Sequence, residues 1–190
     1  MRTASVSRVA IRTVLVGAAV TALVTGCSPT KDGTPTTSSG KPANGEQKVF
    51  NPCTELSDEA LRATKADPAS KHVVTDAPSG GVVARICKWT STEGPYFVTV
   101  SSTSYTLDDV RKNTEAVVLG DVKVGPRSGL ISGSKGDADK LECYVSLPAA
   151  QGTVDVSVGW RYSERSSMPE APPCRLAVRH ATDLEPYLPK

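Results

Sequence analysis

The sequence of 190 residues contains five cysteines, and the first of them, Cys27, stands in a pattern that supports lipid chemistry. It closes Val24-Thr25-Gly26-Cys27, an aliphatic residue and two small residues before the thiol, which matches the bacterial lipobox. In that chemistry the thiol takes a diacylglycerol, and the small residues give a peptidase access to the bond before the cysteine. The sequence therefore predicts a lipidated Cys27 and removal of a signal peptide, residues 1–26.

The residues before Cys27 have the pattern of an export signal. Arg2, Arg8 and Arg12 precede an apolar run at 14–24, which is too short to span a bilayer because a spanning helix needs about 20 residues. An ordinary secretory signal, or an uncleaved anchor that contains a cysteine, is the alternative. Two acyl chains are sufficient for stable attachment, so we expect a lipid anchor at the cell membrane, with the later residues on its extracytoplasmic face.

The stretch behind the lipobox has the composition of a linker. Residues 28–48 consist mainly of Ser, Thr, Gly, Pro and Lys, with no aliphatic side chain larger than Ala. Such a segment cannot bury enough apolar area to fold, and about 21 flexible residues reach roughly 25 Å. We therefore predict a disordered tether over residues 27–49, which serves as a plain spacer or carries O-linked sugar.

The other four cysteines are even in number, which in an exported domain indicates two disulfides. A zinc site is the alternative, but the sequence has no Cys-x-x-Cys pair and no histidine at a metal-like spacing. Four cysteines allow three connectivities. The sequential one closes two loops of about 30 residues, each worth about 3–4 kcal/mol. The expected pairs are Cys53 with Cys87 and Cys143 with Cys174.

Few other residues could support catalysis. The two histidines, His72 and His180, lie in a polar stretch and on a predicted terminal helix, and we expect both to be solvated or helix-terminal. Ser132-Gly-Ser-Lys135 matches Ser-x-x-Lys, but the companion motifs of that enzyme class are missing, so we interpret residues 132–139 as a Gly-rich turn. Asp137 and Asp139 lack the spacing of a calcium loop. The sequence therefore predicts no catalytic, cofactor or metal site.

The charge balance excludes one class of partner. Three of the 22 basic residues lie in the leader, which leaves 19 basic against 20 acidic residues. Nucleic-acid binding needs a clustered basic face, and a polybasic membrane patch is missing as well. We therefore expect no nucleic-acid partner, and contact with the membrane through the lipid anchor.

Two late segments carry the clearest structural pattern. In Leu141–Leu147 and in Val154–Trp160 every second residue is apolar, which is typical of strands with one buried side. The polar and small residues between the two segments predict a hairpin.

Weaker signals give the remaining elements. They are a helix that begins at Ser57 and fades by Lys65, a hairpin of 82–89 and 96–101, a helix at 106–112, short strands at 121–124 and 128–132, and a terminal helix opened by Pro172-Pro173. Together they predict a single α+β domain over residues 50–190, in which helices cover an antiparallel sheet of about five to six strands.

Several of these motifs are familiar as a set. The lipobox, the Pro52-Cys53 pair before the first helix, the Cys87-Lys-Trp89 strand and the closing Pro-Pro-Cys174 helix resemble the actinobacterial lipoprotein family known as domain of unknown function 3558. The resemblance implies an envelope lipoprotein with no established activity and a fold of the PsbP/Mog1 type. It supplies no catalytic residues.

Two functions remain open for the domain. The first is a non-catalytic binding or accessory module that holds an envelope protein, a wall polymer or a small ligand beside the membrane. The alternative is a hydrolase acting on wall or lipid material, which would need His72 or His180 beside a Ser or Asp in a cleft. A passive surface protein or spacer is a third possibility.

Overall fold

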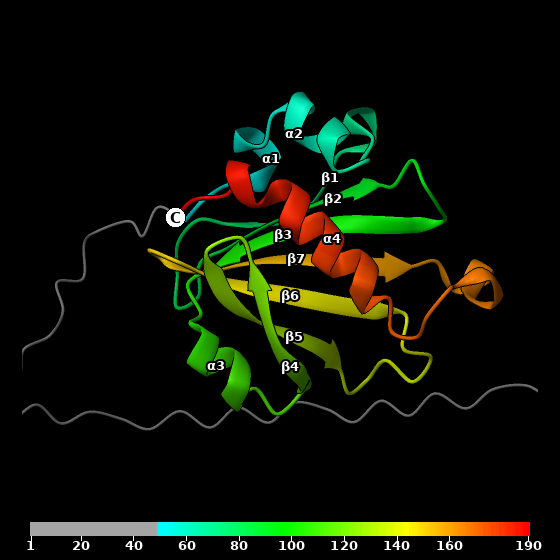
Figure 1. Ribbon diagram of the computed structural model, residues 1–190. Helices are drawn as coiled ribbons and strands as arrows, with labels where there is room; N and C mark the ends of the chain where they lie inside the picture. Colours follow the sequence, from blue (N-terminus) through cyan, green and yellow to red (C-terminus); the bar gives the residue numbers. More distant parts are fainter. Residues whose placement is uncertain (1–48) are drawn as a thin grey trace, which may run out of the picture. The chain divides into compact units, whose positions relative to one another are not determined.

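The computed structural model describes residues 49–190, which fold around one seven-stranded antiparallel sheet (Figure 1). The predicted signal peptide, Cys27 and the tether up to residue 48 lie outside these residues. The strand order is β1-β2-β3-β7-β6-β5-β4. In chain order the strands are β1 (His72–Ala77), β2 (Ala84–Thr90), β3 (Tyr96–Thr103), β4 (Ala116–Val124), β5 (Arg127–Ser134), β6 (Glu142–Ala149) and β7 (Gly152–Trp160).

The α+β class with an antiparallel sheet is confirmed, but the expected number of about five to six strands is wrong because β1 was missed. This strand is at one edge of the sheet and pairs only with β2. Val73 and Val74 are 51% and 49% exposed, and the register shifts between Val73 and Thr75. Because both valines of this bulged edge strand are in solvent, its sequence lacks the alternation of apolar and polar residues that predicts a strand.

The opposite edge strand, β4, is longer than the short strand expected at 121–124. It begins at Ala116 and contains a second irregularity, because its register with β5 shifts between Val118 and Gly120. The extra residue, Leu119, is therefore the bulge. β5 also runs further than expected, to Ser134, so the predicted Gly-rich turn at 132–139 is partly strand.

Two of the helices begin where the sequence predicts their caps. Ser57 accepts a hydrogen bond from the Ala60 amide at 3.2 Å, and Thr106 forms a capping box with Asp109; both caps satisfy amides at a helix start. The helices are α1 (Pro52–Glu55), α2 (Asp58–Ala63), α3 (Leu107–Lys112) and α4 (Cys174–Leu184), with 3-10 turns η1 (Pro68–Ser70), η2 (Tyr162–Ser167) and η3 (Glu185–Tyr187).

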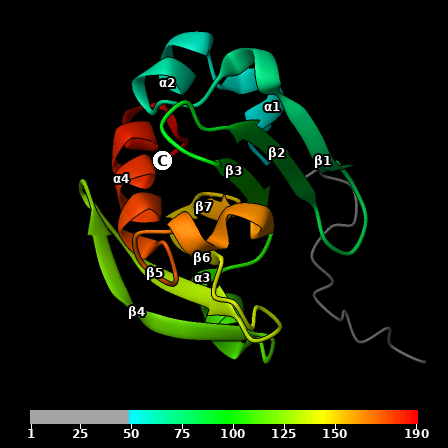
Figure 2. The same ribbon diagram turned by 90° about the vertical axis from the view of Figure 1, so that its right-hand side faces the viewer.

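One face of the sheet, here the covered face, is packed against helices. Figure 2 shows α2 and α4 on the same side of the sheet. α4 lies against β6 and β7 and buries Ala177, Ala181 and Leu184 completely. The sheet meets this helix with the alternating valines of β7, of which Val156 and Val158 are fully buried. Burial of a valine or leucine is worth about 1.5–3 kcal/mol, so this layer carries much of the stability.

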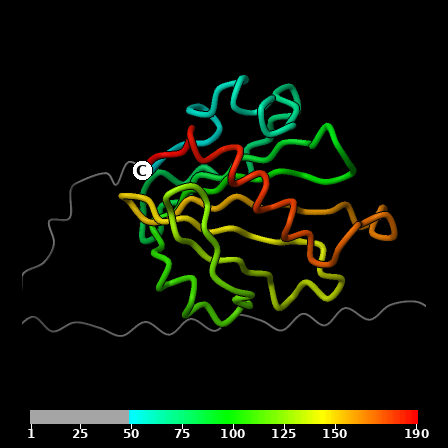
Figure 3. Tube along the Cα trace, in the orientation of Figure 1, coloured from blue at the N-terminus to red at the C-terminus, as the bar shows by residue number. Residues whose placement is uncertain are grey.

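The other face, here the open face, has polar side chains on its central strands, although Leu130 of β5 is fully buried on it. Asp155 of β7 pairs with Ser101 of β3 on one side and with Ser146 of β6 on the other. Figure 3 follows the chain from β3 through α3 to β4 at the far edge. α3 covers one end of this face, where Arg111 pairs with Asp121 of β4 at 2.9 Å.

Two disulfides join helices to the sheet, in the sequential connectivity. Cys53–Cys87 connects α1 to β2, and Cys143–Cys174 connects β6 to the first residue of α4. The first bridge lies one strand from β1, and the second holds the segment in front of α4. Each half of the sheet therefore has a disulfide of its own, one strand from the β1 edge and two strands from the β4 edge.

Candidate functional site

The residues singled out in the sequence are scattered over the fold. The predicted lipidation site, Cys27, lies outside the described residues, and the other four cysteines are joined in disulfides. His72 is exposed at the start of β1. These residues do not form a common site with His180, whose environment differs from the expected one.

His180 is fully buried, so the expectation of a solvated or helix-terminal side chain is wrong. Its Nδ1 lies 2.8 Å from the Thr64 hydroxyl, and its Nε2 lies 3.2 Å from the Tyr96 hydroxyl. Burial, and then the nearby Arg179, lower the pKa of His180 to about 4. The neutral ring, with both nitrogens engaged, connects α4 to β3 and to the end of α2, which is a structural role.

The Ser-x-x-Lys match also separates in space. Ser132 is buried within β5, whereas Lys135 is in the turn that follows it. Asp137 is in the same turn, where its Oδ2 accepts a hydrogen bond from the Glu142 amide at 2.8 Å. Within residues 49–190 no group of three or more His, Cys, Asp or Glu side chains is placed to hold a metal ion.

A hollow of about 350 Å³ lies beside β4 and is here called the β4 hollow. It is enclosed by the edge strand, the end of β5, the turn that follows β5 and the segment before α4. Most of its lining is apolar. The lining residues are Val117, Leu119, Gly133, Ser134, Lys135, Asp137, Ala138, Lys140, Glu142 and Pro172.

Gly133 leaves this space open. It is the β5 partner of Val117, and a Cβ at this position would meet nothing closer than the Leu119 Cδ1 and the Glu142 carbonyl oxygen, both at 3.9 Å. A Cβ at this position would therefore enter the hollow without a clash. The missing side chain, together with the bulge at Leu119, produces a concave apolar surface at the sheet edge.

The strand beside the hollow is unusually apolar for an exposed edge. Val117, Val118 and Leu119 are 39%, 39% and 49% exposed and follow one another directly. Edge strands commonly carry charges or proline, which block pairing with other chains. Contiguous apolar surface at such an edge is typical of an interaction site.

The charges around the hollow are unequal. The Glu142 carboxylate is turned to the open face, where the Tyr144 hydroxyl donates to it and where a Cβ on Gly159 would lie 3.6 Å from its Oε1. Asp137 is engaged with the Glu142 amide. Lys135 and Lys140 form no ion pair with any acid of the described chain. Within the lining, Lys135 and Lys140 are therefore the charged side chains without an ion-pair or hydrogen-bond partner in residues 49–190.

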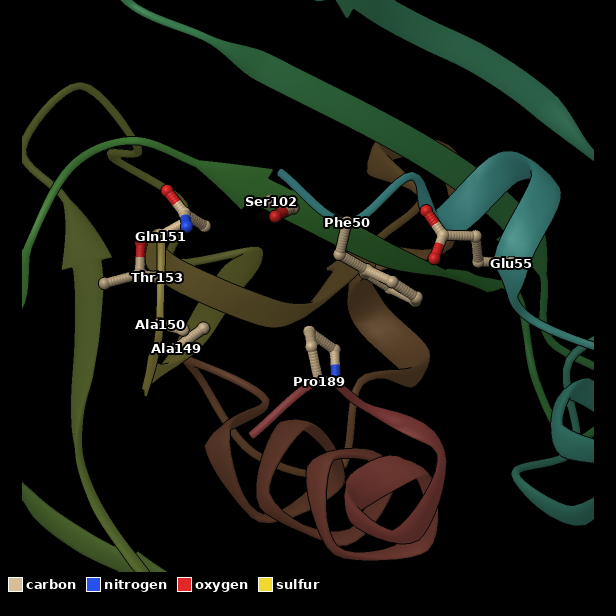
Figure 4. Close-up of a pocket in the computed structure, with 8 residues that line it drawn as sticks. All are labelled: Phe50, Glu55, Ser102, Ala149, Ala150, Gln151, Thr153 and Pro189. Atoms are coloured by element: carbon tan, nitrogen blue, oxygen red, sulfur yellow. The ribbon is translucent and has the colours of Figure 1, made fainter. Parts of the chain in front are cut away.

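A second hollow, of about 240 Å³, lies between α1, the turn joining β6 to β7 and the C-terminal segment (Figure 4). Phe50 and Pro189 face each other across it in Figure 4. The carboxylate of Glu55, in its lining, already accepts a hydrogen bond from the Asn51 amide at 2.8 Å. This space has no exposed strand edge beside it, so the β4 hollow is the stronger candidate.

Asp155 is the most perturbed acid on the open face. Its Oδ1 is buried and has no hydrogen-bond partner, and burial raises the pKa of the carboxyl to about 6, against a smaller opposing effect of Ser146. In the sequence it is only one polar position among alternating valines. The register is what places it between two serines, in the middle of the sheet.

The β4 hollow was missed in the sequence, although one signal was present. Val117-Val118-Leu119 is an apolar run inside a polar segment, but without alternation it did not predict a strand. Gly133 and Pro172 come from distant parts of the chain, so nothing local connects them to that run. Among the helices of residues 49–190 none is long and apolar enough to cross a membrane.

One protein-family model matches the chain, over residues 22–187, and its description is a protein of unknown function (DUF3558). The match includes the lipobox, all four disulfide cysteines and most of the described domain. No curated protein and no solved structure matches the chain.

Proposed function

The chain belongs to the DUF3558 family, and we propose that this member is a lipid-anchored, non-catalytic binding module of the cell envelope that holds its ligand in the β4 hollow. The observation that carries the proposal is the apolar hollow itself, which is bordered by an exposed edge strand and left open by Gly133. Concave, mostly apolar surfaces with a few polar groups are the usual form of ligand sites.

The chemistry of the hollow favours binding over hydrolysis. Its lining contains no histidine and no cysteine, and His180 is enclosed between Thr64 and Tyr96. A nucleophile needs a base within hydrogen-bond reach. The lining includes Ser134 and Asp137, but the Ser134 Oγ accepts from the Gly136 amide at 3.3 Å and the Asp137 carboxylate accepts from the Glu142 amide, so these two side chains do not pair. Capture of a ligand requires only the shape and charge that the lining residues supply.

The envelope location rests on the N-terminal sequence. The lipobox at Val24–Cys27 and the Ser/Thr/Pro-rich residues behind it support a lipid anchor, followed by a flexible tether that holds the domain off the membrane. We extend the proposal to an actinobacterial origin, which the family resemblance supports. A fold of the PsbP/Mog1 type is supported by helices layered on one face of an antiparallel sheet.

The binding proposal is tested on protein taken from the membranes in which it matures. Native mass spectrometry should detect a non-covalent ligand on the wild-type chain, and the Gly133→Leu variant should have lost it because leucine fills the hollow. Gly81→Leu is the matched control, since a Cβ at Gly81 meets nothing within 4 Å. Equal occupancy in wild type and Gly133→Leu, or no ligand on either, would contradict the proposal.

The lipid anchor has a separate test. The mature protein should begin at Cys27 with a diacylglycerol attached, as measured by intact-mass analysis, and Cys27→Ala should abolish the lipid. An unmodified Cys27 that still follows residues 1–26 would contradict the anchor and leave the hollow unaffected.

A further inference from the structure

We infer that the β4 hollow takes an anionic amphiphile, a single medium-length aliphatic chain that ends in a carboxylate or phosphate group. The inference rests on the proposed function, because it names the ligand class of the same site. Three properties of the hollow carry it: its lining, its size and the charge on its rim.

The lining selects an aliphatic chain. Val117 and Leu119 come from the edge strand, and Ala138 and Pro172 close the other sides. None of these side chains contains a polar atom, and the backbone at Gly133 adds a flat wall. Apolar area removed from water on both partners supplies the driving force for such a ligand.

The size limits the length of the chain. A volume of about 350 Å³ corresponds to about twelve water molecules at roughly 30 Å³ each. It accommodates an aliphatic chain of about ten carbons with a small head group. A two-chain phospholipid exceeds this volume, so the proposed occupant is a single-chain amphiphile.

The rim selects the head group. Lys135 and Lys140 have no acidic partner within residues 49–190, while the Glu142 carboxylate is held on the other face by Tyr144. The same turn contains two aspartates: Asp137, whose carboxylate accepts from the Glu142 amide, and Asp139, which is exposed and does not line the hollow. An anionic head group at the mouth of the hollow would pair with the lysines, whereas a cationic one would be repelled.

The same features argue against a peptide added as an eighth strand. The bulge at Leu119 interrupts the regular ladder of the edge, and such bulges are a common device against strand addition. An extended peptide would also cover the strand along its length, whereas the apolar surface ends at Gly120, before Asp121 and Lys123. A peptide that bound instead of an amphiphile would be seen in the test below.

The test compares three ligands of nearly equal size and different charge: decanoate, decanamide and decylammonium. The chain from residue 28 onward, secreted without the lipidated cysteine, contains every described helix and strand and both disulfides. Titration calorimetry below the micellar range should rank decanoate first and decylammonium last. We expect the affinities for decanoate and decylammonium to differ about tenfold, which is the effect of two partly exposed ion pairs. Decyl phosphate should bind like decanoate.

Two sets of variants locate the effect. Lys135→Glu/Lys140→Glu should reverse the ranking, and Lys123→Glu, on β4 but outside the hollow, should not. The Gly133→Leu variant should bind all three ligands with at least tenfold lower affinity, and the Gly81→Leu control should bind them as the wild type does. If Gly133→Leu folds poorly, Leu119→Ser removes apolar lining from an exposed position and should give the same loss.

The outcomes separate this inference from the proposed function. Equal affinity for the three ligands, with loss in Gly133→Leu, would overturn the charge preference and leave the hollow as a binding site. Failure of every amphiphile to bind, or binding unaffected by Gly133→Leu, would overturn the inference. The proposed function would then stand or fall on the native ligand, and recovery of a peptide as that ligand would replace the amphiphile.

Discussion

The two edges of the sheet resemble each other and yet have different surroundings. β1 exposes Val73 and Val74, β4 exposes Val117, Val118 and Leu119, and each strand contains a bulge. Of the two hollows described above, only the β4 hollow borders an edge strand, and Lys135 and Lys140 belong to its lining. Under the proposed function, exposed valines on an edge are not sufficient for a site. The glycine that leaves space and the lysines that line the hollow distinguish β4 from β1.

The largest expected effects on stability come from removing the disulfides, of which each half of the sheet has one. Removal of either bridge, as Cys53→Ala/Cys87→Ala or Cys143→Ala/Cys174→Ala, should lower the free energy of unfolding by about 3–4 kcal/mol in urea denaturation, because the loops are similar in length. Their effects on binding should differ. Pro172, which lines the hollow, is two residues before Cys174. Only loss of the Cys143–Cys174 disulfide should therefore lower the affinity for decanoate.

The comparison would fail if the Cys53–Cys87 variant lost decanoate binding to the same degree at a temperature where both variants are folded. That result would mean that the hollow depends on the whole domain and not on the support at its own edge.

The next largest effect is on the pH dependence of stability and comes from His180, which lies between the two edges. Its pKa in the folded protein is lowered to about 4 from 6.5, so the unfolded chain takes up a proton first as the pH falls. Stability is unaffected above pH 6.5 and is lost progressively between pH 6.5 and 4, by about 1–3 kcal/mol. His180→Gln should be less stable overall and lack this loss, as measured by urea denaturation at a series of pH values.

Asp155 should oppose His180 over nearly the same range. Its pKa in the folded protein is raised from 3.8 to about 6, so the folded chain holds the proton more tightly. Its contribution favours folding below pH 4 and is lost as the pH rises through 6. The Asp155→Asn variant should therefore have a free energy of unfolding about 1–2 kcal/mol higher at pH 7. Its stability should also fall more steeply on acidification, because Asp155 no longer offsets the loss caused by His180. An unchanged pH profile would refute the assignment to Asp155.

The smallest effects come from two matched helix caps. Thr106→Ala removes the cap of α3, which leads into β4, and Ser57→Ala removes the cap of α2, which is followed by β1. Each should cost about 1 kcal/mol. Hydrogen exchange should speed up in β4 for the first variant and in β1 for the second. Equal changes at both edges would show that the edges are not independent.

Local patterns in the sequence predicted the elements whose residues are sorted by burial. The alternation over Val154–Trp160 gave β7, because each valine in it faces α4. Ser57 and Thr106 marked helix starts correctly, since a cap is a contact within three residues. The pairing of these elements in hairpins followed from the short polar turns between them.

Features that depend on distant segments could not be predicted in this way. His180 is buried because its partners, Tyr96 and Thr64, lie 84 and 116 residues away in the chain. The hollow requires Leu119, Gly133 and Pro172 to meet, and none of these residues marks a site by its type. β1 escaped detection because an edge strand has a neighbour on only one side and no buried face of its own.

The central claim is that a ligand binds at the β4 edge and not at the β1 edge. Its most direct test is a decanoate titration followed by backbone amide NMR. The account predicts shifts concentrated at Val117, Leu119 and Gly133, with the amides of Val73 and Val74 unmoved. Shifts centred on β1, or on the hollow around Phe50, would contradict it.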